Sequence, residues 1–154
     1  MKYLSLFMFL LGLLSTEAIA SKAGNDVSQY SYGDCLLEAA NHYQVSPDLI
    51  NAIIKTESNH QIDAININTR GSEDVGLMQI NSEWLPRIKK LGYDRSSLFD
   101  PCTNITVGTW ILAQEVQRFG YTWIAVGAYN AGPSKKQALR RERYATRVYN
   151  NLSR

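Results

Sequence analysis

The chain has 154 residues, with 16 Lys and Arg against 14 Asp and Glu and a formal net charge of +2. This near balance does not call for a nucleic-acid partner. The length suits one domain with a hydrophobic core rather than two, and no Gly-, Ser- or Pro-rich linker or internal repeat divides it.

The first twenty residues have the pattern of a secretory signal peptide. Lys2 gives a positive start, residues 3–14 are almost wholly apolar, and Ala18-Ile19-Ala20 fits the small-x-small cleavage pattern. The apolar run is shorter than the roughly 20 residues of a membrane span, and an uncleaved N-terminal anchor is the alternative. We expect a signal peptide over 1–20, an N-terminal extension over 21–33, one folded domain over 34–154, and no stable membrane span.

The two cysteines agree with export. Cys35 and Cys102 both lie outside the expected signal peptide. In an oxidising compartment such a pair forms a disulfide, whereas two buried free thiols are the alternative. No Cys/His cluster accompanies them, so no metal site is expected.

Helical patterns dominate the first half of the folded region. A short helix is expected over 34–43, with Asp34 as its N-cap. Ser46-Pro47-Asp48 then combines a capping hydroxyl, a first-turn proline and an acid near the helix N-terminus. The apolar residues that follow have helical spacing, and Glu57 continues their stripe.

The rest of the chain reads as one small wing followed by helices. Residues 60–74 suggest a loop or small hairpin around Ile65-x-Ile67, and Ser82 is expected to cap a short helix through residue 90, interrupted near Pro86. Helices are expected over 104–119, stopped by Gly120, over 121–129 and over 137–151. The predicted fold is predominantly α, with one non-helical wing.

Glu57 is the first candidate for chemistry. It follows Ile53 by four residues and Ile50 by seven, so it extends an apolar face. Burial there favours the neutral carboxyl and raises its pKa, which is what a general acid needs near pH 7. On its own, the residue would equally suit a Glu at a helix end that faces water.

Four blocks change that balance. They occur in this order: Glu57-Ser58, Gly76-Leu77-Met78-Gln79, Ala128-Tyr129-Asn130-Ala131-Gly132 and Tyr144. This ordered set resembles the catalytic domain of the soluble-lytic-transglycosylase family, from about Cys35 to Tyr149. The resemblance implies a goose-type-lysozyme-like α+β fold over 34–154, a single helical domain with a small β-hairpin wing. It implies no cofactor.

The resemblance also implies roles for individual residues. Glu57 is similar to the single catalytic acid/base of the family, and Ser58 to the neighbour that helps to orient it. The remaining matched positions imply substrate binding: Gly76, Met78, Gln79, Asn81, Tyr129, Asn130 and Tyr144. Packing is the alternative for Met78, Tyr129 and Tyr144.

The implied reaction cleaves the glycan strands of peptidoglycan. In this family a protonated Glu donates to the oxygen between N-acetylmuramic acid and N-acetylglucosamine. The resulting carboxylate then accepts the proton of the muramic 6-hydroxyl, which attacks the anomeric carbon. The product is a 1,6-anhydromuramyl end, formed without net hydrolysis.

Asp74 departs from the family pattern. The stretch from Gly71 to Ser82 is similar to the active-site wing of chicken-type lysozymes, where an Asp supplies a second carboxylate, and Asp74 stands at that position. Its alternative is a turn residue that bonds its own backbone beside a Gly. The rival functions are therefore a hydrolytic muramidase using Glu57 with Asp74 and a non-catalytic wall-binding assembly factor.

The small size, Asp74 and the cysteine pair most resemble the specialised transglycosylases of type III secretion, conjugation and type IV pilus systems. This resemblance implies a periplasmic protein of a Gram-negative cell, with components of such a system as partners.

Three further features lie outside these motifs: the tryptophans, the histidines and a basic run. Trp84 is expected at the cleft edge, Trp110 and Trp123 in the core, and His42 and His60 as ordinary surface or loop residues. The basic run from Lys135 to Arg147 suits a wall polymer, a membrane surface, an acidic partner or simply water.

Overall fold

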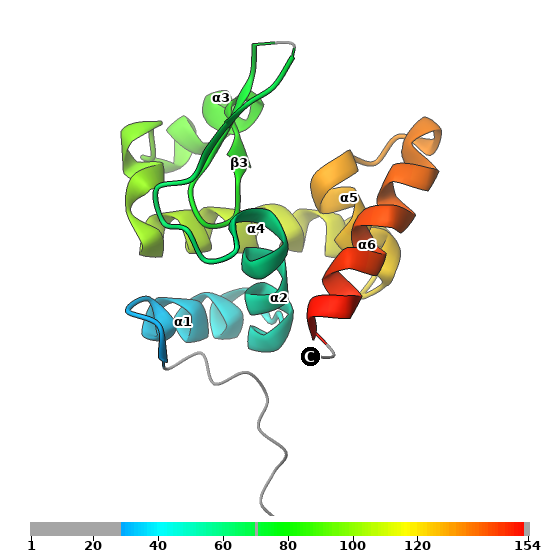
Figure 1. The fold of residues 1–154 in the computed structure, drawn as a ribbon, viewed down its shortest axis with the longest axis horizontal. Coiled ribbons are helices and arrows are strands. Elements are labelled where there is room, and N and C mark those ends of the chain that lie inside the picture. Colours follow the sequence, from blue (N-terminus) through cyan, green and yellow to red (C-terminus); the bar gives the residue numbers. More distant parts are fainter. Residues whose placement is uncertain (1–28, 70, 153–154) are drawn as a thin grey trace, which may run out of the picture.

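A computed structural model describes residues 29–69 and 71–152 of the chain (Figure 1). The expected signal peptide and most of the expected extension lie outside the described residues. The elements in chain order are α1 (Gly33–Tyr43), α2 (Pro47–Ser58), β1 (Ile65–Ile67), β2 (Glu73–Val75), β3 (Ile80–Asn81), η2 (Ser82–Trp84), α3 (Leu85–Ile88), η3 (Lys89–Leu91), η4 (Ser96–Phe99), α4 (Pro101–Phe119), α5 (Trp123–Ala131), η5 (Lys135–Gln137) and α6 (Ala138–Leu152). The predicted class, predominantly helical with a small β wing, is confirmed.

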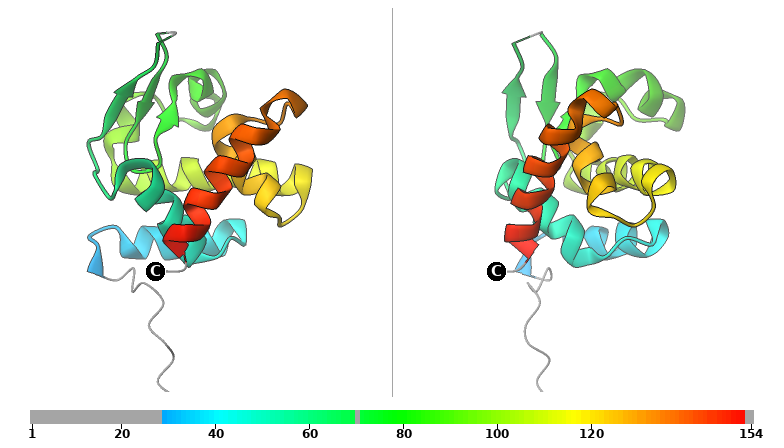
Figure 2. Two further views of the ribbon diagram at one scale, coloured as in Figure 1. Left: turned by 45° about the vertical axis from the view of Figure 1, so that its right-hand side comes forward. Right: turned by 90° about the vertical axis from the view of Figure 1, so that its right-hand side faces the viewer.

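The wing is a three-stranded antiparallel sheet in the order β1-β2-β3. It stands to one side of the helices, with α5 and α6 on the other side (Figures 1 and 2). The register pairs Asn66 with Asp74 and Asp74 with Asn81, so these three side chains form one row across a face of the sheet. The expected hairpin is present. The two-residue strand β3 was not expected, because so short a strand has no alternation to detect.

Apolar stripes on α2 and α4 form the centre of the core. On α2, Leu49, Ile50, Ile53 and Ile54 are buried at helical spacing. The helix α4 runs across the molecule below the wing and behind the upper end of α2 (Figure 1). The disulfide between Cys35 and Cys102 joins α1 to the first turn of α4, with a Cα–Cα distance of 5.2 Å. The expected disulfide is therefore present.

Two of the expected N-caps are different in the structure. Helix α1 begins one residue early, with Tyr32 as its N-cap residue and Asp34 in the first turn. Helix α2 begins after Ser46 as expected, but the Ser46 hydroxyl makes no capping bond. Instead, the Ser46 N–H donates to Tyr121 Oη at 2.9 Å, which ties the start of α2 to the start of α5.

Downstream, three short polar side chains cap helices. Asn81, rather than Ser82, caps the short helices near Pro86 by accepting the Glu83 N–H at 2.9 Å. Asp100 accepts the Thr103 N–H at 2.7 Å, so α4 begins three residues earlier than expected. Thr122 caps α5 by accepting the Ala125 N–H at 3.4 Å.

Helices α5 and α6 pack with their backbones unusually close. A Cβ atom at Gly127 would lie 2.5 Å from the Arg141 carbonyl oxygen, so only glycine permits this contact. The close contact fixes the position of α6, whose Tyr144 side chain extends toward α2.

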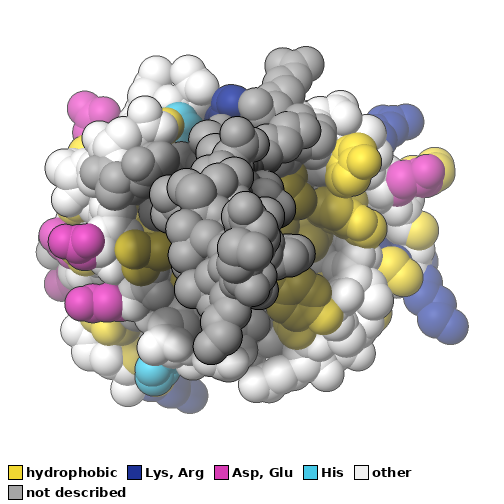
Figure 3. All heavy atoms as spheres, turned by 90° about the horizontal axis from the view of Figure 1, so that it is seen from below, with side chains coloured by type: hydrophobic (Ala, Val, Ile, Leu, Met, Phe, Trp, Pro, Cys, Tyr) yellow, Lys and Arg dark blue, Asp and Glu magenta, His cyan; other side chains and the backbone are white. Residues whose placement is uncertain are grey.

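Charge is unevenly distributed over the surface. Seen from below, acidic side chains gather on the side of α1, and apolar side chains form patches toward the side of α5 and α6 (Figure 3). Within the described ranges, no helix is long and apolar enough to cross a membrane.

Candidate active site

Glu57 lies in the last turn of α2 and receives hydrogen bonds from the two helices opposite. Tyr144 Oη on α6 donates to Glu57 Oε1 at 2.6 Å, and the Asn130 side chain on α5 also bonds the carboxyl. Desolvation raises the Glu57 pKa to about 7, against the bonds from Tyr144 and Asn130 and the charge of Arg147, which lower it. A carboxyl with this pKa is available as both acid and base at neutral pH.

Asp74 on β2 belongs to the same site. Its negative charge raises the pKa of Glu57, so the two carboxyls interact electrostatically. Its Oδ1 accepts from Asn81 Nδ2 at 2.7 Å, and its Oδ2 from Asn68 Nδ2 at 3.0 Å and Asn66 Nδ2 at 3.3 Å. Asp74 thus sits in a strand with side-chain partners on both sides, unlike a turn residue that bonds its own backbone.

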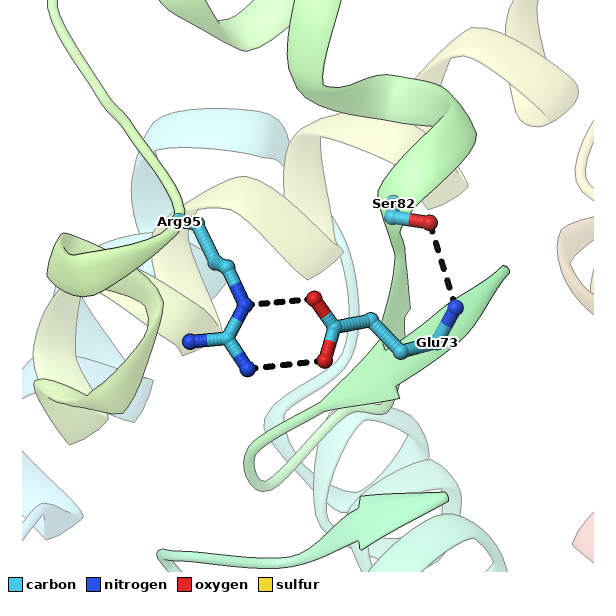
Figure 4. Close-up of polar contacts among 3 residues, drawn as sticks. All are labelled: Glu73, Ser82 and Arg95. Atoms are coloured by element: carbon cyan, nitrogen blue, oxygen red, sulfur yellow. Dashed lines mark hydrogen bonds and ion pairs between the residues drawn. The ribbon is translucent and has the colours of Figure 1, made fainter. Parts of the chain in front are cut away.

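The neighbouring acid, Glu73, points to the other face of the sheet. Both of its carboxylate oxygens pair with the guanidinium of Arg95, and its N–H donates to Ser82 Oγ at 3.1 Å (Figure 4). The Arg95 partner lowers the pKa of Glu73. The strand alternation therefore leaves Asp74, and not Glu73, on the amide-lined face.

The Gly76–Gln79 block forms a tight turn between β2 and β3. Gly76 has φ +76°, and a Cβ atom there would lie 2.2 Å from Asn104 Nδ2. Gln79 also has a positive φ of 49°, and its Nε2 donates to the carbonyls of Ala64 at 3.2 Å and Gly76 at 2.9 Å. The Gln79 amide nitrogen therefore closes the turn on itself.

Met78 is a core residue with a structural role. Its side chain is completely buried against Gly108 of α4, which agrees with the packing alternative for this residue. Its carbonyl accepts the Tyr129 hydroxyl at 2.6 Å. Met78 thereby fixes the Tyr129 ring, which lies 6.3 Å from the ring of Tyr144 between their centroids.

Asn104 escaped sequence reasoning and fastens the whole turn to α4. Its Oδ1 accepts the Met78 N–H at 2.8 Å, and its Nδ2 donates to the carbonyls of Val75 at 2.9 Å and Leu98 at 2.8 Å. The side chain is fully buried. Its one signal in the sequence is a polar residue on an otherwise apolar helix face.

Ser58, Tyr129 and Asn130 take different positions around the acid. Ser58 Oγ donates to the Ile54 carbonyl of its own helix at 3.3 Å, so it does not orient Glu57 by a side-chain bond as expected. Tyr129 is partly buried, and desolvation raises its pKa well above the ordinary value. Asn130 is exposed, which leaves it accessible to a ligand in the cleft.

The aromatic expectations hold only in part. Trp84 and Trp110 are partly buried and meet edge to face, with ring centroids 5.7 Å apart. Trp123 is 43% exposed, so its expected core position is wrong. His60 makes side-chain contacts that its expected role as an ordinary surface or loop residue does not include. Its two ring nitrogens bond the hydroxyls of Tyr30 and Tyr32.

Over the described ranges, no three His, Cys, Asp or Glu residues gather into a group able to hold a metal ion. The site accordingly consists of acids, amides and phenols. Such groups can transfer a proton and hydrogen-bond sugar hydroxyl and acetamido groups.

A family model and two relatives match most of this chain. The model of the family described as "Transglycosylase SLT domain" matches residues 34–151. "Invasion protein IagB" of Salmonella typhimurium is 43% identical over 122 residues, covering 79% of this chain and 76% of that protein. "Protein IpgF" of Shigella flexneri is 37% identical over 117 residues, covering 75% and 77%.

Two solved structures share the fold. An inactive mutant of lytic transglycosylase Slt from Pseudomonas aeruginosa superposes with a TM-score of 0.66 at 23% identity, a likeness of fold alone. The 70 kDa soluble lytic transglycosylase SLT70 of Escherichia coli gives a TM-score of 0.57 at 27% identity. The matched parts cover 79% and 78% of this chain but 23% and 19% of those longer proteins. The chain thus belongs to the transglycosylase SLT domain family and is a peptidoglycan lytic transglycosylase.

Proposed function

We propose that Glu57 is the single acid/base of the transglycosylase reaction. The observation that supports this most directly is its pKa of about 7, produced by burial and moderated by bonds from Tyr144 and Asn130. The protonated carboxyl donates to the glycosidic oxygen as the bond to the muramic anomeric carbon breaks. The carboxylate then takes the proton of the muramic 6-hydroxyl, whose oxygen closes the 1,6-anhydro ring.

Asp74 has an electrostatic role in this scheme. Positive charge develops at the anomeric carbon as the leaving oxygen departs, and an ionised carboxylate across the cleft stabilises it. The amides of Asn66, Asn68 and Asn81 hold the Asp74 carboxyl group in place by hydrogen bonds to both of its oxygens. Gly76 and Gln79 shape the turn beside it, while Tyr129, Asn130 and Tyr144 complete the opposite wall of the sugar site.

The same carboxylate favours one alternative, a hydrolytic muramidase. A water molecule activated by either acid would then replace the 6-hydroxyl as nucleophile and yield reducing ends. Asp74 bonded by three amides is the specific observation in favour of this reading. A sacculus digest therefore has to report which end is formed.

Mass spectrometry of muropeptides released from purified sacculi tests the proposal. Transglycosylation yields anhydro ends, lighter by one water than the reducing ends that hydrolysis yields. Glu57→Gln is expected to lower release by about 10²- to 10⁴-fold, the usual contribution of a general acid. Full activity in this variant would refute the role of Glu57. Sacculus binding without release by the wild type would indicate a binding factor.

The cellular setting is also part of the proposal. We infer that residues 1–20 direct export, that residues 34–154 form the catalytic domain, and that the protein works in the periplasm. A role in opening the wall for a secretion, conjugation or pilus apparatus is supported by the resemblance of the motifs and by the name "invasion protein" of one relative. Periplasmic pull-down with Glu57→Gln as bait would identify components of such an apparatus.

A further inference from the structure

One arginine of α6 is directed at the backbone that follows α5. Arg141 is partly buried, whereas its neighbours Arg140 and Glu142 are exposed. Its Nη1 donates to the carbonyl oxygens of Gly132 at 3.3 Å and Ser134 at 2.6 Å. Both carbonyls belong to the segment that directly follows α5, so the guanidinium binds the end of that helix.

The backbone of Arg141 contacts α5 at a second point. A Cβ atom at Gly127 would lie 2.5 Å from the Arg141 carbonyl oxygen. Gly127 lies about one turn before Asn130 in α5, and Gly132 lies two residues after it. Arg141 therefore holds α5 before Asn130 through its backbone and after Asn130 through its side chain.

The end of α5 needs such a partner. A helix leaves its last carbonyls without intrahelical partners, and a cation near its C-terminus also interacts favourably with the helix dipole. The Gly132 N–H closes the last turn by donating to the Ala128 carbonyl at 2.8 Å. Arg141 supplies donors for the carbonyls beyond that turn. Removing the guanidinium therefore frees the last turn of α5 to fray.

Helix α4 holds the guanidinium from the other side. The Arg141 guanidinium carbon lies 5.8 Å from the centroid of the Phe119 ring, within the range of a cation–π contact. Its charge also lowers the pKa of Glu115, a carboxyl that is only 4% exposed. Arg141 is thus fixed between α4 and the end of α5.

The last turn of α5 carries a group that acts on the catalytic acid. Asn130 is the second-last residue of α5, and its side chain bonds the Glu57 carboxyl. Because Asn130 is exposed, its position follows that of the helix turn that carries it. Other groups that interact with Glu57 are Tyr144 and Arg147 of α6, Asp74 of β2 and Tyr129 of α5.

We propose that Arg141 is a positioning residue of the transglycosylase, which holds the last turn of α5 where Asn130 can bond the Glu57 carboxyl. The inference rests on the proposed function, because the bond matters to the reaction only if Glu57 is the acid. Arg141 acts on Glu57 only through Asn130 in this scheme.

An NMR titration of the Glu57 carboxyl tests this role. The protein carries ¹³C-labelled glutamate side chains, and the signal missing from Glu57→Gln identifies Glu57. Asn130 favours the ionised form, so Arg141→Gln should raise the Glu57 midpoint by about half a pH unit, as should Asn130→Ala. The alkaline limb of kcat/KM for anhydro-end release should move up equally. The midpoint of the folded signal does not depend on how much of the sample is folded, so a less stable variant is still informative.

The double variant Arg141→Gln/Asn130→Ala separates positioning from charge. If Arg141 acts through Asn130, the double variant should have the same midpoint as Asn130→Ala alone. A further rise would show that the lost positive charge acts on Glu57 directly, and would overturn the proposal. An unchanged midpoint in Arg141→Gln would overturn it as well. Arg140→Gln, which removes an equal charge from an exposed neighbouring position, is the control and should keep the wild-type midpoint.

This test can fail independently of the proposed function. The titration needs no turnover, so it reports on Arg141 even if no anhydro ends are released. The role of Glu57 as the acid fails instead if Glu57→Gln releases anhydro ends at the wild-type rate, whatever the titration shows.

Discussion

At the scale of single residues, the site depends on opposing influences on one carboxyl. Burial and the charge of Asp74 favour the protonated form of Glu57, whereas Tyr144, Asn130 and Arg147 favour the ionised form. The outcome is a pKa of about 7, because desolvation by burial is the largest of these influences. Removing one influence at a time should therefore move the pKa in a known direction.

Two variants should move the alkaline limb of the pH–rate profile in opposite directions. The limb lies near pH 7 in the wild type, because donation requires protonated Glu57. Tyr144→Phe removes a donor to the carboxylate, so the Glu57 pKa rises and the limb moves up by about half to one pH unit. Asp74→Asn removes a like charge, so the Glu57 pKa falls and the limb moves down.

The measurement is kcat/KM for anhydro-end release between pH 5 and 9. Tyr121→Phe is a matched control, because Tyr121 bonds the Ser46 N–H far from Glu57 and should leave the limb in place. Shifts of the same sign in the Tyr144 and Asp74 variants would contradict this account of the site.

The raised pKa also predicts a cost in stability. The folded state holds the Glu57 proton up to about pH 7, whereas the unfolded chain releases it near the ordinary value of 4.5. The wild type should therefore lose stability as the pH rises from 4.5 through 7. Glu57→Gln avoids the loss and should melt about 7–14 °C higher than the wild type at pH 8, but equally at pH 4.

Thermal melts at the two pH values provide the check, with Glu38→Gln as control, since Glu38 is an exposed acid on α1. A wild type that melts higher than Glu57→Gln at pH 8 would show that ionised Glu57 is not destabilising.

At the scale of elements, one buried amide determines where the wing sits. Asn104 bonds the backbone at Val75, Met78 and Leu98, so the turn that follows Asp74 is attached to α4. Gly76 allows the contact, because any side chain there would collide with that amide. The position of Asp74 relative to Glu57 thus depends on a residue that does not reach the cleft.

Asn104→Ala should lower the free energy of unfolding by about 3–5 kcal/mol, because it leaves buried N–H and C=O groups unpaired and opens a cavity. Chemical denaturation measures the loss. Asn41→Ala, at an exposed position of α1, should stay within about 0.5 kcal/mol of the wild type. A similarly small effect at Asn104 would mean that water replaces its bonds.

The elements were predictable where local signals act alone. Pro47 at the start of α2 and Gly120 at the end of α4 marked helix boundaries correctly. Ser46 is the N-cap residue as predicted, but its hydroxyl makes no capping bond, and its N–H bonds Tyr121, which is distant in sequence. Trp123 failed because an apolar residue in a helix does not reveal whether another helix covers it.

The sequence motifs predicted which segments form the site, but they did not predict which side chains contact one another. Glu57, Tyr144 and Asn130 are brought together as the motifs implied. Met78 and Ser58 belong to the same motifs, yet one is core and the other bonds its own helix. Asn104 lies outside every motif, since its partners are backbone groups that carry no sequence signal.

At the scale of the whole molecule, the disulfide joins the first described helix to the central one. Loss of the bond in Cys35→Ala/Cys102→Ala should cost about 2–4 kcal/mol, because the unfolded chain regains the freedom of a long loop. Denaturation with and without reductant checks this. Reductant should bring the wild type down to the level of the double variant and leave the variant unchanged. A response of the variant to reductant would point to another cause.

The bond between Tyr144 and Glu57 spans 87 positions of the chain. Nearly the entire domain must fold before the last helix delivers the phenol to the acid. A chain in which α6 is still unformed has the glutamate but not its partner. The hydrogen bond that adjusts the pKa of Glu57 therefore forms only when the last helix of the domain has folded.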